Sequence, residues 1–252
     1  MGILNVTPDS FSDGGSYDAP GPAVERALKM QSEGAAIIDI GGESTRPGAP
    51  AVDLQQELDR VLPVIRALAG ELDIPLSIDT SKPRVMQAAI AAGAGMINDV
   101  NGLRAPGAIE AAKKANVPVC VMHMQGQPRT MQRAPVYEDV VSEVRQYLSD
   151  RIAACEAAGI PRSRILVDPG FGFGKTLEHN LALLAGLNSF QELGVPLLVG
   201  LSRKSTIGQI TGKPVDDRLA GSLAAAVMAV ERGASIVRVH DVAATVDAHG
   251  PG

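Results

Sequence analysis

Four polar side chains of complementary chemistry follow short apolar segments of this sequence. They are two carboxylates, one carboxamide and one ammonium group, carried by Asp79, Asp168, Asn98 and Lys204. Carboxylates accept hydrogen bonds in pairs from adjacent N–H groups, whereas amide and ammonium groups donate to ring acceptors. The set therefore predicts a site for a flat polar heterocycle, held by a few polar groups in an otherwise apolar pocket.

A second set of side chains is cationic or rich in hydrogen-bond donors. It comprises Asn5, Thr45, Arg46, Arg238 and His240. Arg238 and His240 are two positions apart on a predicted strand, so both can face the same way and bind phosphate oxygens. Mg²⁺ often takes few protein ligands beside substrate phosphates, and Asn5 can supply one oxygen. These residues predict a diphosphate site with Mg²⁺; the alternative is a surface strand end that carries an ion pair.

Apolar walls for a flat ring are available in Met122 and Phe173, although plain core packing is the alternative for both. A pterin ring suits such a pocket, because it presents adjacent N–H donors beside acceptor atoms. Two glycine-rich segments, 41–43 and 172–175, resemble phosphate loops but lack the spacing of a Walker or a dinucleotide-binding loop. We interpret both as flexible loops at the rim of the site.

These side chains need a scaffold that brings strand ends together. Eight short apolar segments have the character of buried parallel strands, at residues 2–6, 36–40, 75–78, 96–97, 117–122, 165–167, 196–199 and 235–239. Segments with apolar residues at helical spacing lie between them, at 23–32, 54–69, 84–92, 137–158 and 218–231. Eight such units in 252 residues favour a (β/α)8 TIM barrel of the α/β class, with a doubly wound sheet as the alternative.

The connections between these segments are of two kinds. Gly34, Gly93 and Gly233 each end a helical segment before a strand, where a left-handed residue is favoured. At the other strand end, polar residues recur, and in a barrel those ends converge on one face. Capping of the next helix is the alternative for any one of them. The long segments 7–20 and 41–50, after strands 1 and 2, predict loops over the site, with plain disorder as the alternative.

Composition limits the classes of partner. The formal net charge is −5 and the basic residues are dispersed, which argues against nucleic acid or an anionic membrane as a partner. Cys120 and Cys155 lack metal-ligand spacing and are predicted to pack as ordinary thiols. The sequence has neither an apolar run of about 18 residues nor a signal-peptide pattern, so we expect a cytoplasmic protein.

Seven blocks of the sequence together resemble the dihydropteroate synthase family of pterin-binding TIM barrels. They are residues 1–15 (MGILNVTPDSFSDGG), 39–48 (DIGGESTRPG), 77–80 (SIDT), 97–99 (IND), 168–175 (DPGFGFGK), 200–205 (GLSRKS) and 238–240 (RVH). Single blocks are shared with other pterin-binding barrels. The first two long loops combined with the GLSRKS block are highly specific, and the likeness extends over nearly the whole chain.

The resemblance implies a role for individual residues. It implies a pterin pocket of Asp79, Asn98, Asp168 and Lys204, with Met122, Phe173 and Gly200 along its walls. It implies a diphosphate and Mg²⁺ site of Asn5, Arg238 and His240, and a p-aminobenzoate site of Pro47 and Ser205. The loop residues that it implies close over the substrates are Phe11, Asp13, Thr45 and Arg46. The expected catalytic set is Asp13, Thr45, Arg46, Asp79, Lys204, Arg238 and His240.

The family's reaction joins 6-hydroxymethyl-7,8-dihydropterin pyrophosphate to p-aminobenzoate, giving 7,8-dihydropteroate and diphosphate. The resemblance implies that diphosphate leaves first, assisted by Mg²⁺, and that the arylamine attacks a cationic pterin. It also implies inhibition by sulfonamides and a homodimer. Two alternatives remain: a methyltetrahydrofolate methyltransferase, which shares the barrel but needs no diphosphate site, and a pterin-binding protein without turnover.

Residues 1–252 are expected to form one pterin-binding barrel domain, trimmed at one or both ends. The family usually has a segment before the first strand and a longer last helix. Here an apolar strand begins at once, and helical character stops soon after Asp247.

Overall fold

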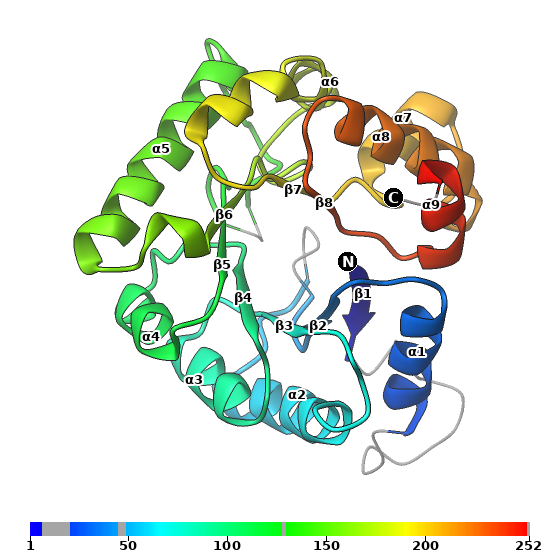
Figure 1. Ribbon diagram of the computed structural model, residues 1–252. Helices are drawn as coiled ribbons and strands as arrows, with labels where there is room; N and C mark the ends of the chain where they lie inside the picture. Colours follow the sequence, from blue (N-terminus) through cyan, green and yellow to red (C-terminus); the bar gives the residue numbers. More distant parts are fainter. Residues whose placement is uncertain (7–20, 45–48, 128–129, 251–252) are drawn as a thin grey trace.

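The computed structural model describes residues 1–6, 21–44, 49–127 and 130–250, and shows a ring of strands surrounded by helices (Figure 1). The strands are β1 (Gly2–Asn5), β2 (Ile38–Gly41), β3 (Leu76–Asp79), β4 (Met96–Asp99), β5 (Val119–Met122), β6 (Ile165–Asp168), β7 (Leu198–Val199) and β8 (Ile236–Val237). The helices are α1 (Gly21–Ser32), α2 (Leu54–Leu68), α3 (Pro83–Ala91), α4 (Ala108–Ala115), α5 (Val140–Ala158), α6 (Leu177–Ala185), α7 (Ser205–Thr211), α8 (Leu219–Glu231) and α9 (Val242–His249).

Hydrogen bonds close the strands into a barrel. β1 to β6 form one parallel sheet in sequence order, and β7 pairs with β8. A bridge from Val167 to Leu197 joins β6 to the segment before β7, and a bridge from Gly2 to Val239 joins β1 to the segment after β8. The backbone N–H of Ile3 donates to the carbonyl oxygen of Val239 over 2.9 Å. The expectation of a (β/α)8 barrel is confirmed.

The last two strands are shorter than the sequence predicts. Pro196 has no N–H to donate to a neighbouring strand, and the regular pairing with β8 is limited to Leu198 and Val199, although Leu197 forms the bridge to Val167. Arg238 and His240 lie just after β8, so the prediction that they belong to one strand is wrong. The position of Arg238 is still fixed, because its backbone N–H donates to the carbonyl oxygen of Val199 over 2.9 Å.

Alternation along the strands separates two apolar layers. Ile38 and Ile40 of β2 are fully buried in the layer between strands and helices. Met96 and Cys120 belong to a separate buried cluster that includes Leu166 and Leu198. Because successive side chains of a strand point to opposite faces, Asp39 projects from the face opposite to its isoleucine neighbours, into the barrel. A polar group is thereby placed among the inward-facing side chains.

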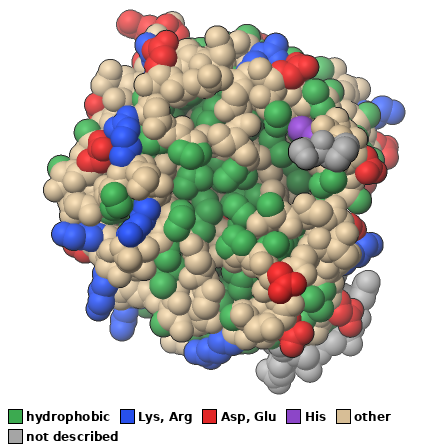
Figure 2. Space-filling model, viewed as in Figure 1, with side chains coloured by type: hydrophobic (Ala, Val, Ile, Leu, Met, Phe, Trp, Pro, Cys, Tyr) green, Lys and Arg blue, Asp and Glu red, His purple; other side chains and the backbone are tan. Residues whose placement is uncertain are grey.

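The amino ends of the strands are closed by apolar side chains. Met1 and Ile37, which precede β1 and β2, pack with Ile236 against the cluster inside the barrel. The chain begins near the centre of the view in Figure 1, and on this face apolar side chains gather centrally while charges of both signs lie nearer the edge (Figure 2). The polar side chains predicted for the site are at the carboxyl ends of the strands instead.

The helices agree with the sequence pattern in part. The five predicted helical segments correspond to α1, α2, α3, α5 and α8. The five predicted segments include none of α4, α6, α7 and α9, which have seven to nine residues each. The helical character expected to stop soon after Asp247 corresponds to α9. The start of α6 also lacked a clear signal: Thr176 caps it, with His179 at the capping-box position where Glu or Gln is usual.

Two further expectations from the sequence are met. Gly34, Gly93 and Gly233 all have positive φ angles, of 94°, 119° and 97°. Cys120 and Cys155 are buried free thiols. In the described part of the chain, no helix combines the length and apolar character needed to cross a membrane.

Candidate active site

Arg238 is at the centre of a buried charge cluster at the carboxyl ends of the strands. Its Nε donates to Oδ2 of Asp39 over 2.6 Å, and its Nη2 donates to Oδ2 of Asp79 over 2.9 Å. Asn98 Nδ2 donates to the same Oδ2 of Asp39 over 3.0 Å. Burial alone would lower the pKa of Arg238, but Asp39 and Asp79 raise it above its usual value. The guanidinium stays charged and joins the ends of β2, β3 and β8.

Two carboxylate oxygens of this cluster are available to a ligand. Oδ1 of Asp39 and Oδ1 of Asp79 are buried and have no hydrogen-bond partner among the described residues. An unpaired buried acceptor is costly, so its presence points to a donor that arrives with a ligand. Burial raises the pKa of Asp79 to about 7, against the attraction of Arg238. A cationic or N–H-rich ligand would favour the ionised carboxylate.

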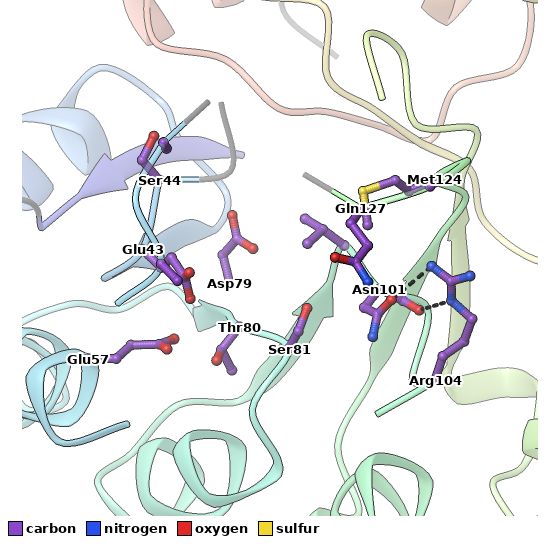
Figure 3. Close-up of a pocket in the computed structure, with 14 residues that line it drawn as sticks. Glu43, Ser44, Glu57, Asp79, Thr80, Ser81, Asn101, Arg104, Met124 and Gln127 are labelled. Atoms are coloured by element: carbon purple, nitrogen blue, oxygen red, sulfur yellow. Dashed lines mark hydrogen bonds between the residues drawn. The ribbon is translucent and has the colours of Figure 1, made fainter. Parts of the chain in front are cut away.

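Asp79 projects into a cavity of about 500 Å³. Figure 3 shows its carboxylate between Glu43 on one side and Gln127 and Asn101 on the other. Segments that follow β2, β3, β4 and β5 supply most of the cavity lining, and α2 supplies Glu57. The cavity is therefore at the end of the barrel where such folds bind their ligands.

The last residue of β6 is the second acidic residue of the predicted pterin site. Asp168 Oδ1 accepts from the backbone N–H of Gly170 over 2.7 Å. Lys204 Nζ donates to the carbonyl oxygen of Phe171 over 2.5 Å and lies 4.7 Å from the centre of the Phe173 ring. Burial raises the pKa of Asp168, and Lys204 opposes this shift. Burial also lowers the pKa of Lys204, to about 8.

Met122 and Phe173 pack together in an apolar cluster that is separate from the main core. The cluster also contains Val100, Met124 and Met131. Two of its members, Val100 and Met124, line the cavity beside Asp79. Packing and ligand contact are therefore compatible, because the cluster forms an apolar surface next to the polar groups.

Gly200 lies between the two cationic side chains. A Cβ atom at this position would be 3.8 Å from Cβ of Arg238 and 3.8 Å from Nζ of Lys204. The missing side chain leaves space between the stem of Arg238 and the ammonium of Lys204. That Gly200 lines the pterin pocket stays a prediction.

His240 and Arg238 have different partners. The ring nitrogen Nδ1 of His240 is 3.0 Å from Oγ of Ser202, and the backbone N–H of His240 donates to the same oxygen over 3.1 Å. His240 is thus held against the loop after β7, whereas Arg238 is held by carboxylates of β2 and β3. Ser205 is exposed and begins α7, directly after Lys204.

Asn5 ends β1, next to Gly41 at the end of β2. A Cβ atom at Gly41 would be 3.8 Å from the side-chain oxygen of Asn5, so the absence of a side chain there leaves this oxygen accessible. The described residues contain no group of three or more His, Cys, Asp or Glu side chains that could hold a metal ion. Asn5 fits a Mg²⁺ that takes most of its ligands from a bound diphosphate.

The base of the second long loop is fixed by an ion cluster. Lys82 Nζ lies 2.5 Å from Glu43 and 2.5 Å from the buried Glu57. The other oxygen of Glu43 accepts from the backbone N–H of Val52 over 3.2 Å. Arg60 donates to the carbonyl oxygen of Gly42 over 2.7 Å. The expectation that residues 41–43 form a flexible loop is therefore wrong.

The segment 172–175 is also not a flexible rim loop. Lys175 Nζ bonds to the carbonyl oxygens of Gly170 and Phe173, and Asn180 accepts from the backbone N–H of Gly172. Tyr137 donates to the carbonyl oxygen of Gly174. These hydrogen bonds hold the loop against α6 and against the segment that carries Tyr137.

The predicted site residues differ in where the structure places them. The expected pterin and diphosphate residues Asn5, Asp79, Asn98, Met122, Asp168, Phe173, Gly200, Lys204, Arg238 and His240 are all at the carboxyl ends of the strands or in the loops that follow. Phe11, Asp13, Thr45, Arg46 and Pro47 lie outside the described residues. Asp99, another polar residue at a strand end, is a turn cap that accepts from Ser81 and from the backbone N–H groups of Asn101 and Leu103.

The sequence reasoning missed two residues of the site. The sequence predicts no role for Asp39, yet its carboxylate binds both Arg238 and Asn98. The feature of the sequence that could have indicated this role is a carboxylate between two isoleucines of a buried strand. Lys175 belongs to the segment that the sequence predicts as a flexible loop. The feature that could have indicated its role is a lysine directly after three alternating glycines.

Comparisons with known proteins agree with this geometry. The family described as pterin binding enzyme matches residues 1–240. The dihydropteroate synthase of Escherichia coli (strain K12) is 55% identical over 248 residues, covering 98% of this chain and 88% of that protein. A Yersinia pestis dihydropteroate synthase in complex with a sulfonamide drug has a TM-score of 0.94 at 54% identity, covering 98% of this chain and 90% of the other. A Xanthomonas albilineans dihydropteroate synthase with 4-aminobenzoic acid has a TM-score of 0.93 at 57% identity, covering 98% and 89%.

Proposed function

Because this chain belongs to the pterin binding enzyme family, with dihydropteroate synthases as its relatives, we infer that it is a transferase of the same activity. It condenses 6-hydroxymethyl-7,8-dihydropterin pyrophosphate with p-aminobenzoate to give 7,8-dihydropteroate and diphosphate in folate biosynthesis. The observation that carries this function is the unpartnered, buried oxygen of Asp79 at the cavity, with Asn98 on β4, Asp168 at the end of β6 and Lys204 in the connection after β7.

The proposed pterin site uses the acidic and apolar groups together. Asp79 and Asp168 accept from the N–H donors of the ring, and Lys204 donates to a ring acceptor. The apolar surface of Met122 and Phe173 contacts the flat face. Because both carboxylates are buried, their charge acts through a medium of low dielectric and favours a pterin that becomes cationic.

The proposed diphosphate site is formed by Arg238 and His240. Two of the five N–H donors of Arg238 are bonded to carboxylates among the described residues, which leaves donors for phosphate oxygens. Arg238 therefore binds the leaving group and the carboxylates at once, and it joins the two halves of the site. Departure of diphosphate before attack by the arylamine fits this arrangement, because each charge that develops meets a residue of opposite charge.

A bound Mg²⁺ would neutralise charge on the departing diphosphate. Asn5 is the residue that we propose holds it. Changing Asn5 to Ala removes the one carboxamide oxygen but no charge, so we expect the Mg²⁺ concentration for half-maximal activity to rise by about tenfold, with little change at saturating Mg²⁺. A Mg²⁺ titration of initial rates measures this. Equal titration curves for the variant and the wild type would exclude Asn5 as a ligand.

The activity is tested with purified protein, both substrates and Mg²⁺. Formation of dihydropteroate is followed by chromatography, and release of diphosphate by a coupled assay. Formation of dihydropteroate should require p-aminobenzoate, because attack by the arylamine completes the reaction. Absence of dihydropteroate under these conditions would sink the proposed function.

A sulfonamide should inhibit this reaction by competing with p-aminobenzoate. Ser205, which the proposed arylamine site uses, begins α7 directly after Lys204 of the proposed pterin site. The apparent KM for p-aminobenzoate should rise in proportion to sulfonamide concentration, while saturating p-aminobenzoate restores the full rate. Inhibition that excess p-aminobenzoate does not relieve would contradict this site.

A homodimer is also proposed. Ile210, Val215 and Leu219 are apolar and exposed on α7, α8 and the turn between them, which supports a surface that a second copy covers. Cytoplasmic location stays a prediction.

A further inference from the structure

We propose that Lys175 is a positioning residue for the pterin site, through the loop after β6. This inference rests on the proposed function, since it concerns the same pocket. Lys175 is only 3% exposed, and a buried ammonium is costly unless acceptors surround it. None of the proposed substrate contacts involves Lys175, so its burial needs another reason.

The ammonium of Lys175 has three N–H donors, and three acceptor atoms surround it. Nζ of Lys175 lies 2.9 Å from the carbonyl oxygen of Gly170, 3.0 Å from that of Phe173 and 2.9 Å from Nδ1 of His123. Burial, together with Lys175 itself, lowers the pKa of His123 to about 2. The imidazole is therefore neutral, and its Nδ1 can accept from the ammonium.

The loop after β6 packs directly against the backbone of residues 123–125, so a buried side chain of its own must satisfy its carbonyl groups. Gly170 and Gly174 have φ angles of 70° and 64°. A Cβ atom at Gly170 would be 1.9 Å from the carbonyl oxygen of His123, and one at Gly174 would be 2.4 Å from that of Gln125. No side chain fits between the two segments. Without the ammonium, the carbonyl groups of Gly170 and Phe173 would lose a buried hydrogen bond.

Two pterin-binding groups depend on this loop. The backbone N–H of Gly170 donates to Asp168, so the residue that Lys175 holds also orients the carboxylate. Phe173, whose carbonyl oxygen Lys175 binds, presents its ring to Lys204 and packs with Met122. Lys175 therefore sets the positions of an acidic and an apolar group of the pocket without touching the ligand.

Lys175 also acts on Asp168 by charge. Burial raises the pKa of Asp168, whereas Lys204, Lys175 and Arg238 lower it. The buried thiol of Cys120 also faces Asp168, and burial keeps it neutral by raising its own pKa. Burial lowers the pKa of Lys175 to about 7, so below that pH its charge helps to keep Asp168 ionised.

The test compares Lys175→Met with Tyr137→Phe. Methionine fills a similar volume but has no donor and no charge. Tyr137 donates to the carbonyl oxygen of Gly174 over 2.8 Å, so Tyr137→Phe removes a hydrogen bond to the same loop without changing a charge. Lys175→Gln is the third variant, because it keeps N–H donors without charge and guards against poor folding of the Met variant.

Two quantities are measured on each folded variant. Calorimetry at pH 7 gives the Kd for the dihydropterin pyrophosphate with Mg²⁺ and without arylamine. Carbon-13 NMR of labelled aspartate carboxyls gives the pKa of Asp168, assigned with Asp168→Asn. For Lys175→Met we expect Kd to rise at least about tenfold and the pKa of Asp168 to rise by about one unit, the low end of the effect of a nearby opposite charge.

The other two variants separate the two effects. Lys175→Gln should recover part of the affinity while the pKa of Asp168 stays raised, and Tyr137→Phe should leave that pKa unchanged. An unchanged Kd and an unchanged pKa in both Lys175 variants would overturn the inference. If the wild-type protein itself bound no pterin, the proposed function would fail instead, so the two failures are distinguishable.

Discussion

Replacing Asp79 with Asn should lower kcat/KM for the dihydropterin pyrophosphate by about a thousandfold, roughly 4 kcal/mol of transition-state stabilisation. Asp79 offers a buried oxygen with no partner among the described residues, and an Asn at this position would present one acceptor and one donor where the ligand needs two acceptors. The negative charge that favours a cationic pterin is lost as well. Steady-state rates with each substrate varied in turn measure the effect.

The loss should not come from unfolding. Burial raises the pKa of Asp79 to about 7, so its contribution to stability is full below its unfolded pKa and is lost as the pH rises to about 7. The Asn variant avoids ionisation at this site and should be at least as stable as the wild type at pH 8. Asp73→Asn is the matched control, because Asp73 is exposed before the amino end of β3. A rate within twofold of wild type for Asp79→Asn would contradict the proposed pterin site.

Much of the site could be predicted because a barrel turns sequence order into spatial proximity. Asp79, Asn98 and Asp168 are each the residue at or near the end of a buried strand, and parallel strands end on one face. The polar residue type and its position were therefore enough to place them together. Asp99 had the same pattern and caps a turn, so strand-end position alone does not separate ligand contacts from caps.

The partners of these residues could not be predicted. The pair of Arg238 with Asp39 joins residues 199 positions apart, and side-chain direction at the strand ends decided it. The sequence suggested one strand that carries both Arg238 and His240, because apolar residues extend through Val239. Pairing in β8 stops at Val237, and the two side chains have different partners. Local pattern sets which residues meet at the rim, and packing decides which of them bond.

Changing Arg238 to Met should abolish detectable turnover and also destabilise the fold. Arg238 bonds to Asp39 and Asp79, so its removal leaves two buried carboxylates unpaired, at a cost of about 3–5 kcal/mol. For a chain of this size we expect the melting temperature to fall by about 10 °C at pH 8. Arg84→Met, at an exposed arginine on α3, is the control and should change neither rate nor melting temperature.

The pH dependence distinguishes a charge effect from lost packing. Without Arg238 the pKa of Asp79 should rise further, and a carboxyl group with a raised pKa stabilises the fold at low pH and loses that contribution as the pH rises. The difference in melting temperature between wild type and Arg238→Met should therefore grow between about pH 6 and pH 8. Adding Asp79→Asn to Arg238→Met should recover part of the stability at pH 8 and none of the activity. A stability difference that is constant over this pH range would mean that Arg238 acts through packing alone, and the charge cluster would then not be what holds the ends of β2, β3 and β8 together.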